Sequence, residues 1–274
     1  MKNVLYDYGY GSAWTDVHID RREGYYTSVA DYHEHDFYEI NLIVSGNVKI
    51  LLADRSEQGT QNRIVLTKPG TPHFISCNPD TLYSRLYLVF SRDFAENCVP
   101  EWEQLEAVFG KSGSIVTITP VQKDFFIMLI NNIENEANPF RQKLLVLYLL
   151  SCIKDCLSGC NQSSVATPPY IIKALDYINK HYTEKIVASK LAQTLYIGRT
   201  TLMTDFKKYT GNTLNGYIVH CRLKNSLILL QSGKTIQQTA ELCGFGDSSG
   251  LIRCFKKHFG TTPKQYIKDA ASQL

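Results

Sequence analysis

The stretch IQQTAELCGFGDSSGLIRCFKKHFGTTPKQYI, residues 236–267, decides the fold of the C-terminal part of the chain. Its pattern predicts a short helix over 236–243, a turn at Gly244-Phe245-Gly246, and a second helix over 248–259 that Gly260 closes. Two short helices joined by a tight turn make a helix-turn-helix unit.

The chain contains the same pattern a second time. The segment DFKKYTGNTLNGYI at 205–218 matches CFKKHFGTTPKQYI at 254–267. This earlier unit has a predicted helix over 187–195, a turn at 196–198, and a helix over 199–209 closed by Gly211. A linking helix over 214–230 has 17 residues, about 26 Å at 1.5 Å per residue. One chain could therefore present two recognition helices to successive major grooves, which lie about 34 Å apart.

The two parts of the chain differ in charge. Residues 170–274 contain 15 Lys and Arg against 6 Asp and Glu, a net charge of +9, whereas residues 1–169 contain 14 against 20, a net charge of −6. A basic half joined to an acidic half indicates a division of labour, with the basic half suited to a polyanion such as DNA. A solvated lysine-rich surface would give the same charge, so the helix-turn-helix units carry the argument.

With these residues in place, 168–274 resembles the DNA-binding domain of the AraC/XylS family of transcription regulators. The second unit supplies most of the matching positions: Ile236, Ala240, Gly244, Phe245, Asp247, Ser249, Arg253, Phe255, Lys256, Lys257, Gly260, Thr262, Pro263 and Tyr266. The first unit adds Leu191, Ala192, Leu202, Phe206, Lys207, Gly211, Tyr217, Arg222, Leu223 and Leu230. Matching spacing over about 100 residues is far more specific than an isolated helix-turn-helix.

The resemblance implies which side chains meet DNA. Base edges would face Arg199, Thr200, Met203 and Thr204 in the first unit, and Ser248, Ser249, Ile252 and Arg253 in the second. Arginine can donate bidentately to guanine, and an apolar side chain can meet a thymine methyl group. Lys207, Lys256 and Lys257 would bind phosphates, while Phe206, Phe255, Leu202 and Leu251 are predicted to be core residues.

Some positions depart from the family pattern. Gly250 stands where an aromatic residue or His is usual, and Gly198 where Ser often caps the helix. A glycine inside a helix costs about 1 kcal/mol relative to alanine. Its lack of a side chain suggests close approach to DNA or weak local readout. Because of these changes, the resemblance does not predict the preferred DNA sequence, but it still predicts that the domain binds DNA.

The rest of the chain predicts a multidomain protein. Residues 1–120 read as short β-strands separated by turn residues, which indicates an all-β barrel or sandwich. Residues 121–157 read as a helical hairpin in which Val121, Phe125, Met128, Leu129 and Ile133 share one helical face. Residues 158–169 (SGCNQSSVATPP) form the predicted linker, in which Thr167 would cap a helix that begins at Pro168, and the all-α DNA-binding domain occupies 170–274.

A second motif lies in the predicted strands. His33, His35 and Glu39, with Gly46 after them, and the later segment Pro69-Gly70-x-x-His73 resemble the two motifs of the cupin barrels. Alternation along a strand would turn His33, His35 and Glu39 to one face, into the barrel. We interpret His33, His35, Glu39 and His73 as an effector-binding site, with no metal, no other cofactor and no enzymatic activity expected. A metal-dependent cupin enzyme with a DNA-binding tail, and a constitutive regulator without an effector, stay open as alternatives.

Several partners follow from these patterns. The effector is a small molecule, such as a sugar, on which Tyr25, Tyr26, Tyr32 and Tyr38 could stack. The aliphatic hairpin suits a self-complementary interface, so we expect a homodimer. The family resemblance implies RNA polymerase as a partner and activation as the mode of control. A cytoplasmic location without membrane attachment is expected, because the N-terminal residues hold no apolar run and the longest aliphatic stretch, 144–150, is far shorter than a bilayer span. None of the eight cysteines form CxxC pairs, so we expect reduced thiols.

Overall fold

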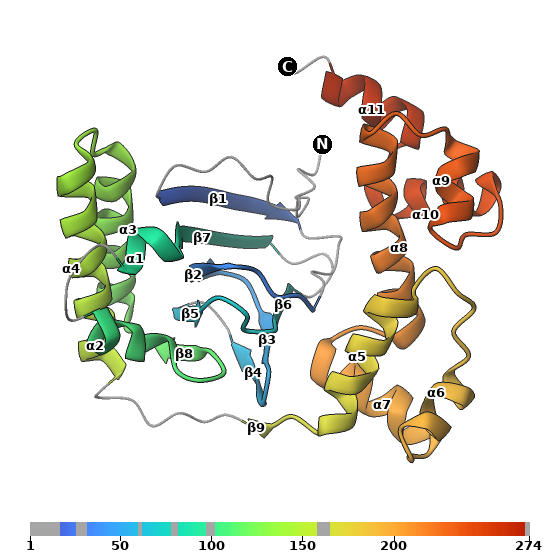
Figure 1. Ribbon diagram of the computed structural model, residues 1–274, viewed down its shortest axis with the longest axis horizontal. Coiled ribbons are helices and arrows are strands. Elements are labelled where there is room, and N and C mark those ends of the chain that lie inside the picture. The colour runs from blue at the N-terminus through green and yellow to red at the C-terminus, as the bar shows by residue number, and fades with distance from the viewer. Residues whose placement is uncertain are drawn as a thin grey trace. The chain divides into compact units, whose positions relative to one another are not determined.

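The computed structural model describes residues 17–25, 32–59, 62–77, 82–96, 102–157 and 165–271. The chain forms two compact units (Figure 1). The first comprises residues 1–26 and 33–167, and the second comprises residues 27–32 and 168–274. Within the described ranges, no helix is both long and apolar enough to cross a membrane.

The first unit is built from two antiparallel sheets, which confirms the predicted all-β class. One sheet has the strand order β1 (Val17–Tyr25), β7 (Leu82–Ser91), β2 (Phe37–Ser45), β5 (Arg63–Thr67) and β8 (Ser114–Thr117). The other has the order β6 (His73–Cys77), β3 (Val48–Leu52), β4 (Arg55–Gly59) and β9 (Val165–Ala166).

The two faces of the five-stranded sheet have different surroundings. Tyr38, Ile40 and Leu42 belong to a core cluster that also contains residues of the helices. Glu39, Asn41 and Ile43 alternate with them along β2, and Ile43 belongs to a second cluster with residues of β3 and β6. Since successive side chains of a strand point to opposite faces, Glu39 and Asn41 lie on the inner face, between the sheets.

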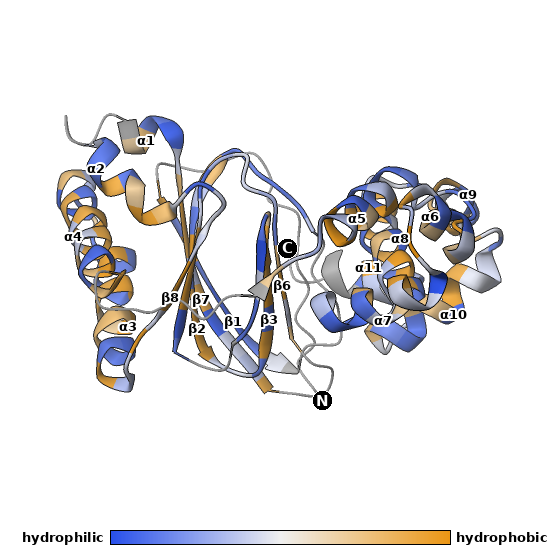
Figure 2. Cartoon of the chain, turned by 90° about the horizontal axis from the view of Figure 1, so that it is seen from below, coloured by the Kyte–Doolittle hydropathy of each residue, from blue (hydrophilic) through white to orange (hydrophobic). Residues whose placement is uncertain are grey.

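A helical hairpin covers the outer face of this sheet (Figures 1 and 2). Its helices are α3 (Pro120–Asn135) and α4 (Pro139–Leu157), and short helices α1 (Arg92–Glu96) and α2 (Trp102–Glu106) lie beside them. A capping box starts α3: Thr119 accepts from the N–H of Gln122, and the Gln122 side chain accepts from the N–H of Thr119.

The face that the hairpin buries differs from the predicted one. In α3 the buried residues are Phe126, Leu129, Ile130 and Ile133. Val121 and Met128 are instead 79% and 51% exposed. The face that these predicted residues share is therefore only partly the one that packs on the sheet, because α3 is apolar on more than one side.

The second unit is all-helical, as predicted. Its helices are α5 (Pro169–His181), α6 (Ala188–Thr194), α7 (Arg199–Thr210), α8 (Leu214–Gln231), α9 (Ile236–Leu242), α10 (Ser248–Phe259) and α11 (Pro263–Ala271). The predicted start of α5 was one residue early, because Pro168 is the residue before the helix, and its conformation is not helical. Thr167 therefore does not cap α5.

Helix α8 connects the two helix-turn-helix units (Figure 1). Its 18 residues span about 27 Å. Arg222 on α8 donates to the carbonyl oxygens of Tyr182 and Glu184 at 2.6 and 2.7 Å, which fixes the turn between α5 and α6. Because the guanidinium of Arg222 binds two backbone carbonyl groups of this turn, helix α8 helps to position the first helix-turn-helix unit as well as joining it to the second one.

The chain is paired to a sheet immediately before the second unit begins. Strand β9 pairs with β4 through Ser56 and Arg55, and the N–H of Thr167 donates to the carbonyl of Asp54 at 3.2 Å. This pairing falls within residues 158–169, the segment expected to be a linker.

Candidate nucleic-acid interface and histidine–glutamate cluster

The two helix-turn-helix units share one turn geometry. In the first, the N–H groups of Tyr196 and Ile197 donate to the carbonyls of Gln193 and Ala192. In the second, the N–H groups of Gly244 and Phe245 donate to those of Glu241 and Ala240. Tyr196 and Gly244 both have positive φ, +56° and +76°, so the duplicated sequence folds into a duplicated turn.

The two turns differ in how closely the chain packs against them. A Cβ atom on Gly244 would lie 2.2 Å from the carbonyl oxygen of Thr183, so only glycine fits. Tyr196, at the equivalent position of the first turn, is 95% exposed. The second turn also has one more residue, Gly246, before helix α10 begins.

The recognition helices end alike and begin differently. Gly211 and Gly260 close α7 and α10 in the left-handed conformation, as predicted. At the start of α10, Asp247 accepts from the N–H of Gly250 at 2.7 Å. Gly198, before α7, supplies no such side chain. No side chain at the N-cap position therefore caps the N–H groups in the first turn of α7.

The predicted DNA-contacting residues share one property, which is that none of them is buried. Helix α7 carries Arg199, Thr200, Met203, Thr204 and Lys207, and α10 carries Ser248, Ser249, Ile252, Arg253, Lys256 and Lys257. The predicted core residues Leu202, Phe206, Leu251 and Phe255 are fully buried, which confirms that the aromatic rings are not stacking platforms. The contacts to DNA themselves stay predictions.

Gly250 has a structural reason within the fold. A Cβ atom there would lie 3.0 Å from the carbonyl oxygen of Phe245 and 3.4 Å from Asp247 Oδ1. The missing side chain thus points back toward the turn before α10. The interpretation that Gly250 allows close approach to DNA is not supported by this direction.

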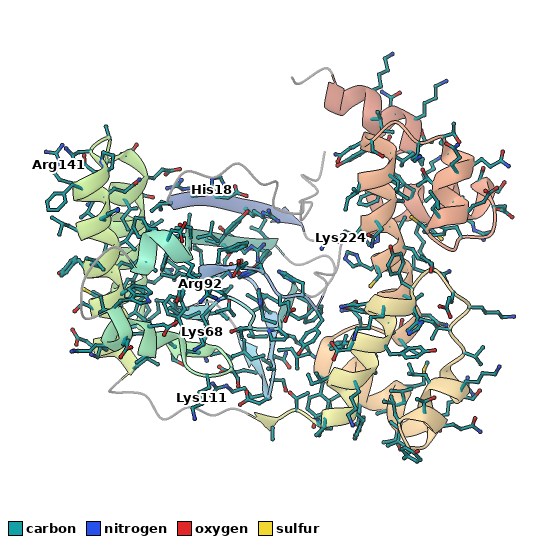
Figure 3. The ribbon with its side chains drawn as sticks, in the orientation of Figure 1. His18, Lys68, Arg92, Lys111, Arg141 and Lys224 are labelled. Carbon is teal, nitrogen blue, oxygen red and sulfur yellow. The ribbon has the colours of Figure 1, made fainter. Side chains whose placement is uncertain are left out.

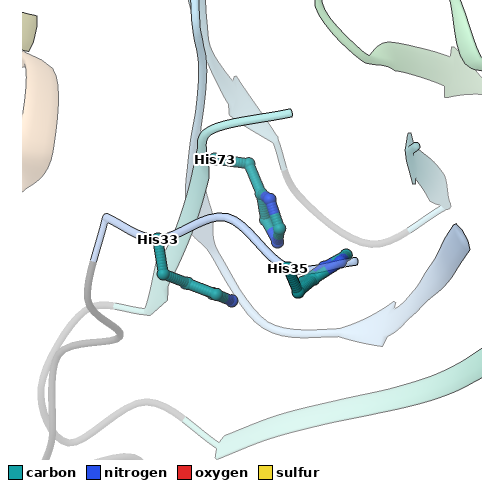
Figure 4. A group of neighbouring side chains, drawn as sticks. All are labelled: His33, His35 and His73. Atoms are coloured by element: carbon teal, nitrogen blue, oxygen red, sulfur yellow. The ribbon is translucent and has the colours of Figure 1, made fainter. Parts of the chain in front are cut away.

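The three histidines of the second motif lie together on the first unit (Figure 4), and Glu39 lies beside two of them. His33 and His35 precede β2, Glu39 is on β2, and His73 begins β6. A backbone bridge fastens the two segments, because the N–H of His33 donates to the carbonyl of His73 at 3.0 Å and the reverse bond is 2.8 Å. The imidazole rings of His33 and His73 have centroids 4.4 Å apart.

Glu39 is the centre of this cluster and is almost completely buried. Its carboxylate oxygens lie 3.4 Å from His35 Nε2 and 3.6 Å from His73 Nε2. Burial alone would raise the pKa of Glu39, but the imidazoles of His35 and His73 outweigh it and hold that pKa well below its ordinary value. The carboxyl group is therefore ionised at neutral pH.

Two buried polar side chains beside Glu39 were not identified from the sequence. Asn41 donates to Glu39 Oε1, and Thr67 lies directly opposite Glu39 on β5. Within the described residues, Thr67 Oγ1 is buried and has no hydrogen-bond partner. Alternation along β2 could have identified Asn41, whereas Thr67 depends on a strand register that the sequence does not give.

The inner face of the sheet continues as a polar wall toward β1. Tyr87 pairs with Asn41 on one side and with Asp20 on the other, so these residues share a face. Arg22 and Arg85 are opposite each other, are both buried, and both place their guanidinium groups 5.1 Å from the centre of the Tyr87 ring. Burial raises the pKa of Tyr87 to about 12, so its hydroxyl stays protonated.

The aromatic residues expected to stack on a ligand do not gather here. Tyr38 packs against Phe90, Trp102 and Phe109 in the core under the helices. Tyr32 groups with the second unit. Tyr26 and the side chain of Tyr25 lie outside the described residues.

Comparisons with known proteins match both units. Residues 17–150 match the family described as AraC-like ligand binding domain, and residues 191–269 match a helix-turn-helix domain family. The Msm operon regulatory protein of Streptococcus mutans is 24% identical over 237 residues, covering 85% of each chain. The xylose operon regulatory protein of Escherichia coli strain K12 is 28% identical over 109 residues, covering 39% of this chain and 28% of that protein. The structure of ToxT from Vibrio cholerae aligns over 92% of this chain and 98% of its own, with 15% identity and a TM-score of 0.39.

Proposed function

Because the chain belongs to the AraC/XylS family of transcription regulators, with a ligand-binding and a DNA-binding domain, we propose that it controls transcription in response to a small molecule. One observation supports this most directly. Two helix-turn-helix units with the same turn geometry carry exposed recognition helices, and both lie in the basic half of the chain.

Helices α7 and α10 are the proposed readers of DNA sequence. Arg199 and Arg253, both exposed, would donate to bases, while Lys207, Lys256 and Lys257 would bind phosphates. Members of this family mostly activate transcription, so we propose that this regulator activates its target genes through contact with RNA polymerase. Its proposed location is the cytoplasm, where it has access to DNA.

The inner face of the first unit is the proposed effector site. Besides His33, His35, Glu39 and His73, it carries Arg22, Arg85, Tyr87 and Asn41, whose groups can hydrogen-bond hydroxyl or carboxylate oxygens. A sugar is the first effector class to test. The name of the xylose operon regulator supports this choice, although that match covers only 39% of this chain.

The exposed face of the hairpin is the proposed dimer interface. It presents Met128 on α3 and Leu144 and Tyr148 on α4, each about half exposed, and the rings of Phe125 and Tyr148 are 6.4 Å apart. Charged side chains stand at its margin, among them Arg141, which pairs with Glu136 at 3.0 Å (Figure 3). An apolar centre with a charged rim suits the same surface of a second copy.

DNA affinity of the full chain tests the main proposal. We expect binding to a target duplex that falls steeply between 50 and 200 mM salt, because lysines and arginines release counterions from phosphates. A folded chain without salt-sensitive DNA binding would contradict the proposal.

The alternatives are separated by a ligand screen. Thermal shift against sugars and other metabolites should reveal a stabilising compound that also changes DNA affinity. A constitutive regulator would bind DNA with no such compound, whereas a cupin enzyme would turn a bound compound over.

A further inference from the structure

Two buried arginines share the inner face of the five-stranded sheet. Arg22 on β1 and Arg85 on β7 are directly opposite each other in the strand register, and each is only 6% exposed. Both guanidinium carbons lie 5.1 Å from the centre of the Tyr87 ring. Like charges that lie opposite each other destabilise a pair of strands. The fold nevertheless places two positive charges together here, in the half of the chain whose net charge is −6.

The protein partners of these arginines leave donors for a ligand. Arg22 Nε lies 3.2 Å from Asp20 Oδ2, and Arg22 Nη2 donates to the Tyr87 hydroxyl at 2.9 Å. That hydroxyl in turn donates to Asp20 at 2.8 Å. A guanidinium has five N–H donors, so an arginine that keeps its protein partners can still donate to a bound molecule. Planar, charged donors of this kind bind carboxylate groups well, because two parallel N–H groups match the two oxygens.

An acceptor stands beside the tyrosine ring on the same face. Asn41 pairs with Tyr87 in the register and is 1% exposed. Its Nδ2 donates to the Glu39 carboxylate, which only accepts, and this fixes which way the amide points. Among the described residues, Asn41 Oδ1 is buried and has no hydrogen-bond partner. A buried amide oxygen in this state needs a donor, and the hydroxyl group of a ligand can supply one.

Thr67 extends this polar surface away from the arginines. It lies opposite Glu39, which is two residues, or about 7 Å, along β2 from Asn41. Its Oγ1 is also buried without a partner in the part of the chain that the structure describes. The inner face therefore presents, in order, two guanidinium groups, an amide oxygen and a hydroxyl group.

We propose that this face binds a hydroxylated carboxylic acid, such as a sugar acid. Arg22 and Arg85 would hold its carboxylate, while its hydroxyl groups would hydrogen-bond to Asn41 Oδ1 and Thr67 Oγ1. A neutral sugar would lose the charge-assisted hydrogen bonds to the guanidinium groups. An acid without hydroxyl groups would leave Asn41 and Thr67 buried without partners. The inference rests on the proposed function, because it names the chemical class of the proposed effector.

Matched ligands test the proposal on the full chain. Calorimetry compares galacturonate with galactose, and glucuronate with glucose, pairs in which a carboxylate replaces one hydroxymethyl group. Hexanoate supplies a carboxylate without hydroxyl groups. We expect at least one sugar acid to bind, and its neutral partner and hexanoate to bind at least about ten-fold more weakly. A panel in which no sugar acid binds, or in which the neutral sugar binds as well as the acid, would overturn the proposal.

Arginine substitutions locate the carboxylate. Arg85→Gln and Arg22→Gln should each weaken binding of the acid at least about ten-fold. The matched control is Arg21→Gln, the same substitution at the neighbouring position of β1. Arg21 is on the opposite face of the strand, where it pairs with Glu134 of α3, so the affinity for the acid should not change.

A substitution of similar shape covers the case in which the arginine variants do not fold. Thr67→Val removes a buried hydroxyl group without a partner, so it should raise the unfolding temperature of the free chain while it weakens binding of the acid. A structural role alone would not produce these opposite effects. If folded Thr67→Val and folded arginine variants bind the acid like the wild type, the proposal is wrong.

DNA affinity, measured with and without the bound compound, keeps the two proposals apart. A sugar acid that binds through these residues but leaves DNA affinity unchanged would retain the site and refute its role as an effector. A neutral sugar that binds more tightly than its acid and changes DNA affinity would retain the regulatory function and refute the acid-binding site.

Discussion

Gly244 and Gly246 lie in the same turn with nearly the same φ, but their surroundings differ. A Cβ atom on Gly244 would collide with the carbonyl of Thr183, whereas Gly246 has nothing within 4 Å. Gly246→Ala should therefore cost only the left-handed strain, about 1–2 kcal/mol. Gly244→Ala should cost about 1–3 kcal/mol more, because the turn must also move away from the carbonyl of Thr183, which follows α5.

Urea unfolding of the full chain, followed by circular dichroism at 222 nm, measures both substitutions. Equal losses for the two variants would show that the turn can shift away from Thr183 at little cost.

Arg253 and Lys257 lie four residues apart on α10, both exposed, and serve as a matched pair. If Arg253 reads guanine, Arg253→Ala should cost about 1–3 kcal/mol on the target and relax preference at one base pair. Lys257→Ala should weaken binding to all sequences alike and reduce the salt slope by about one unit. Affinities for the target and its single-base variants, at several salt concentrations, separate the two roles. Uniform loss in both variants would make Arg253 a phosphate contact and leave readout to Ser248, Ser249 and DNA shape.

At the scale of elements, the hairpin α3–α4 has an exposed apolar face that should pair with a second copy. Met128→Lys should convert the dimer to a monomer, because the interface cannot solvate a buried ammonium group. Leu82→Lys is the matched control, since Leu82 is 47% exposed on β7, against 51% for Met128. Sedimentation at micromolar concentration reports the oligomeric state. A wild-type chain that is already monomeric would rule out this interface.

The sequence predicted some elements well and others poorly. The helices of the second unit repeat apolar residues at 3.6-residue spacing and end at glycines, so α7, α10 and their closing residues agree with the prediction. Strands β4 (RSEQG) and β6 (HFISC) have no strand pattern in the sequence, because β4 is polar throughout and β6 follows a turn without alternation. These strands depend on pairing with β3, a long-range interaction that local sequence does not encode.

The same division holds for the candidate site. Its four motif residues were predicted from their resemblance to the cupin motifs, and the structure brings their side chains close together. The polar wall of Arg22, Arg85 and Tyr87 was missed, because it exists only where β1 and β7 pair in this register.

At the scale of the molecule, the two units should respond differently to acid. Burial, with a smaller contribution from His220, lowers the pKa of His258 from 6.5 to about 4. The unfolded chain then binds this proton between pH 6.5 and 4 and the folded chain does not, so stability falls as pH decreases through that window. The loss is about 2 kcal/mol at pH 5 and about 3 kcal/mol in full. In the first unit, the pKa of Glu39 is lowered, so the ionised carboxylate still contributes to the stability of the folded state below pH 4.5.

Acid titration with two probes checks this order. Trp102 is buried in the core of the first unit, so its fluorescence, measured in a Trp14→Phe background, follows that unit, while helical circular dichroism follows mainly the second unit. As the pH decreases, we expect the helical signal to be lost at a higher pH than the one at which the fluorescence changes. In His258→Gln, the stability of the second unit should depend less on pH between pH 7 and 5. Coincident transitions in both probes would mean that the units unfold together.

The pairing of β9 with β4 also limits the length of chain that connects the first unit to the second. Among the described residues of 165–167, Val165 and Ala166 pair with β4, and the N–H of Thr167 donates to Asp54. Each hydrogen bond contributes about 0.5–1.5 kcal/mol, so thermal energy can release the strand without unfolding either unit. Release would lengthen the connection by about 10 Å, at 3.3 Å per residue. In the proposed dimer, release of this strand in one chain would allow the two DNA half-sites to lie about three base pairs further apart, at about 3.4 Å per base pair.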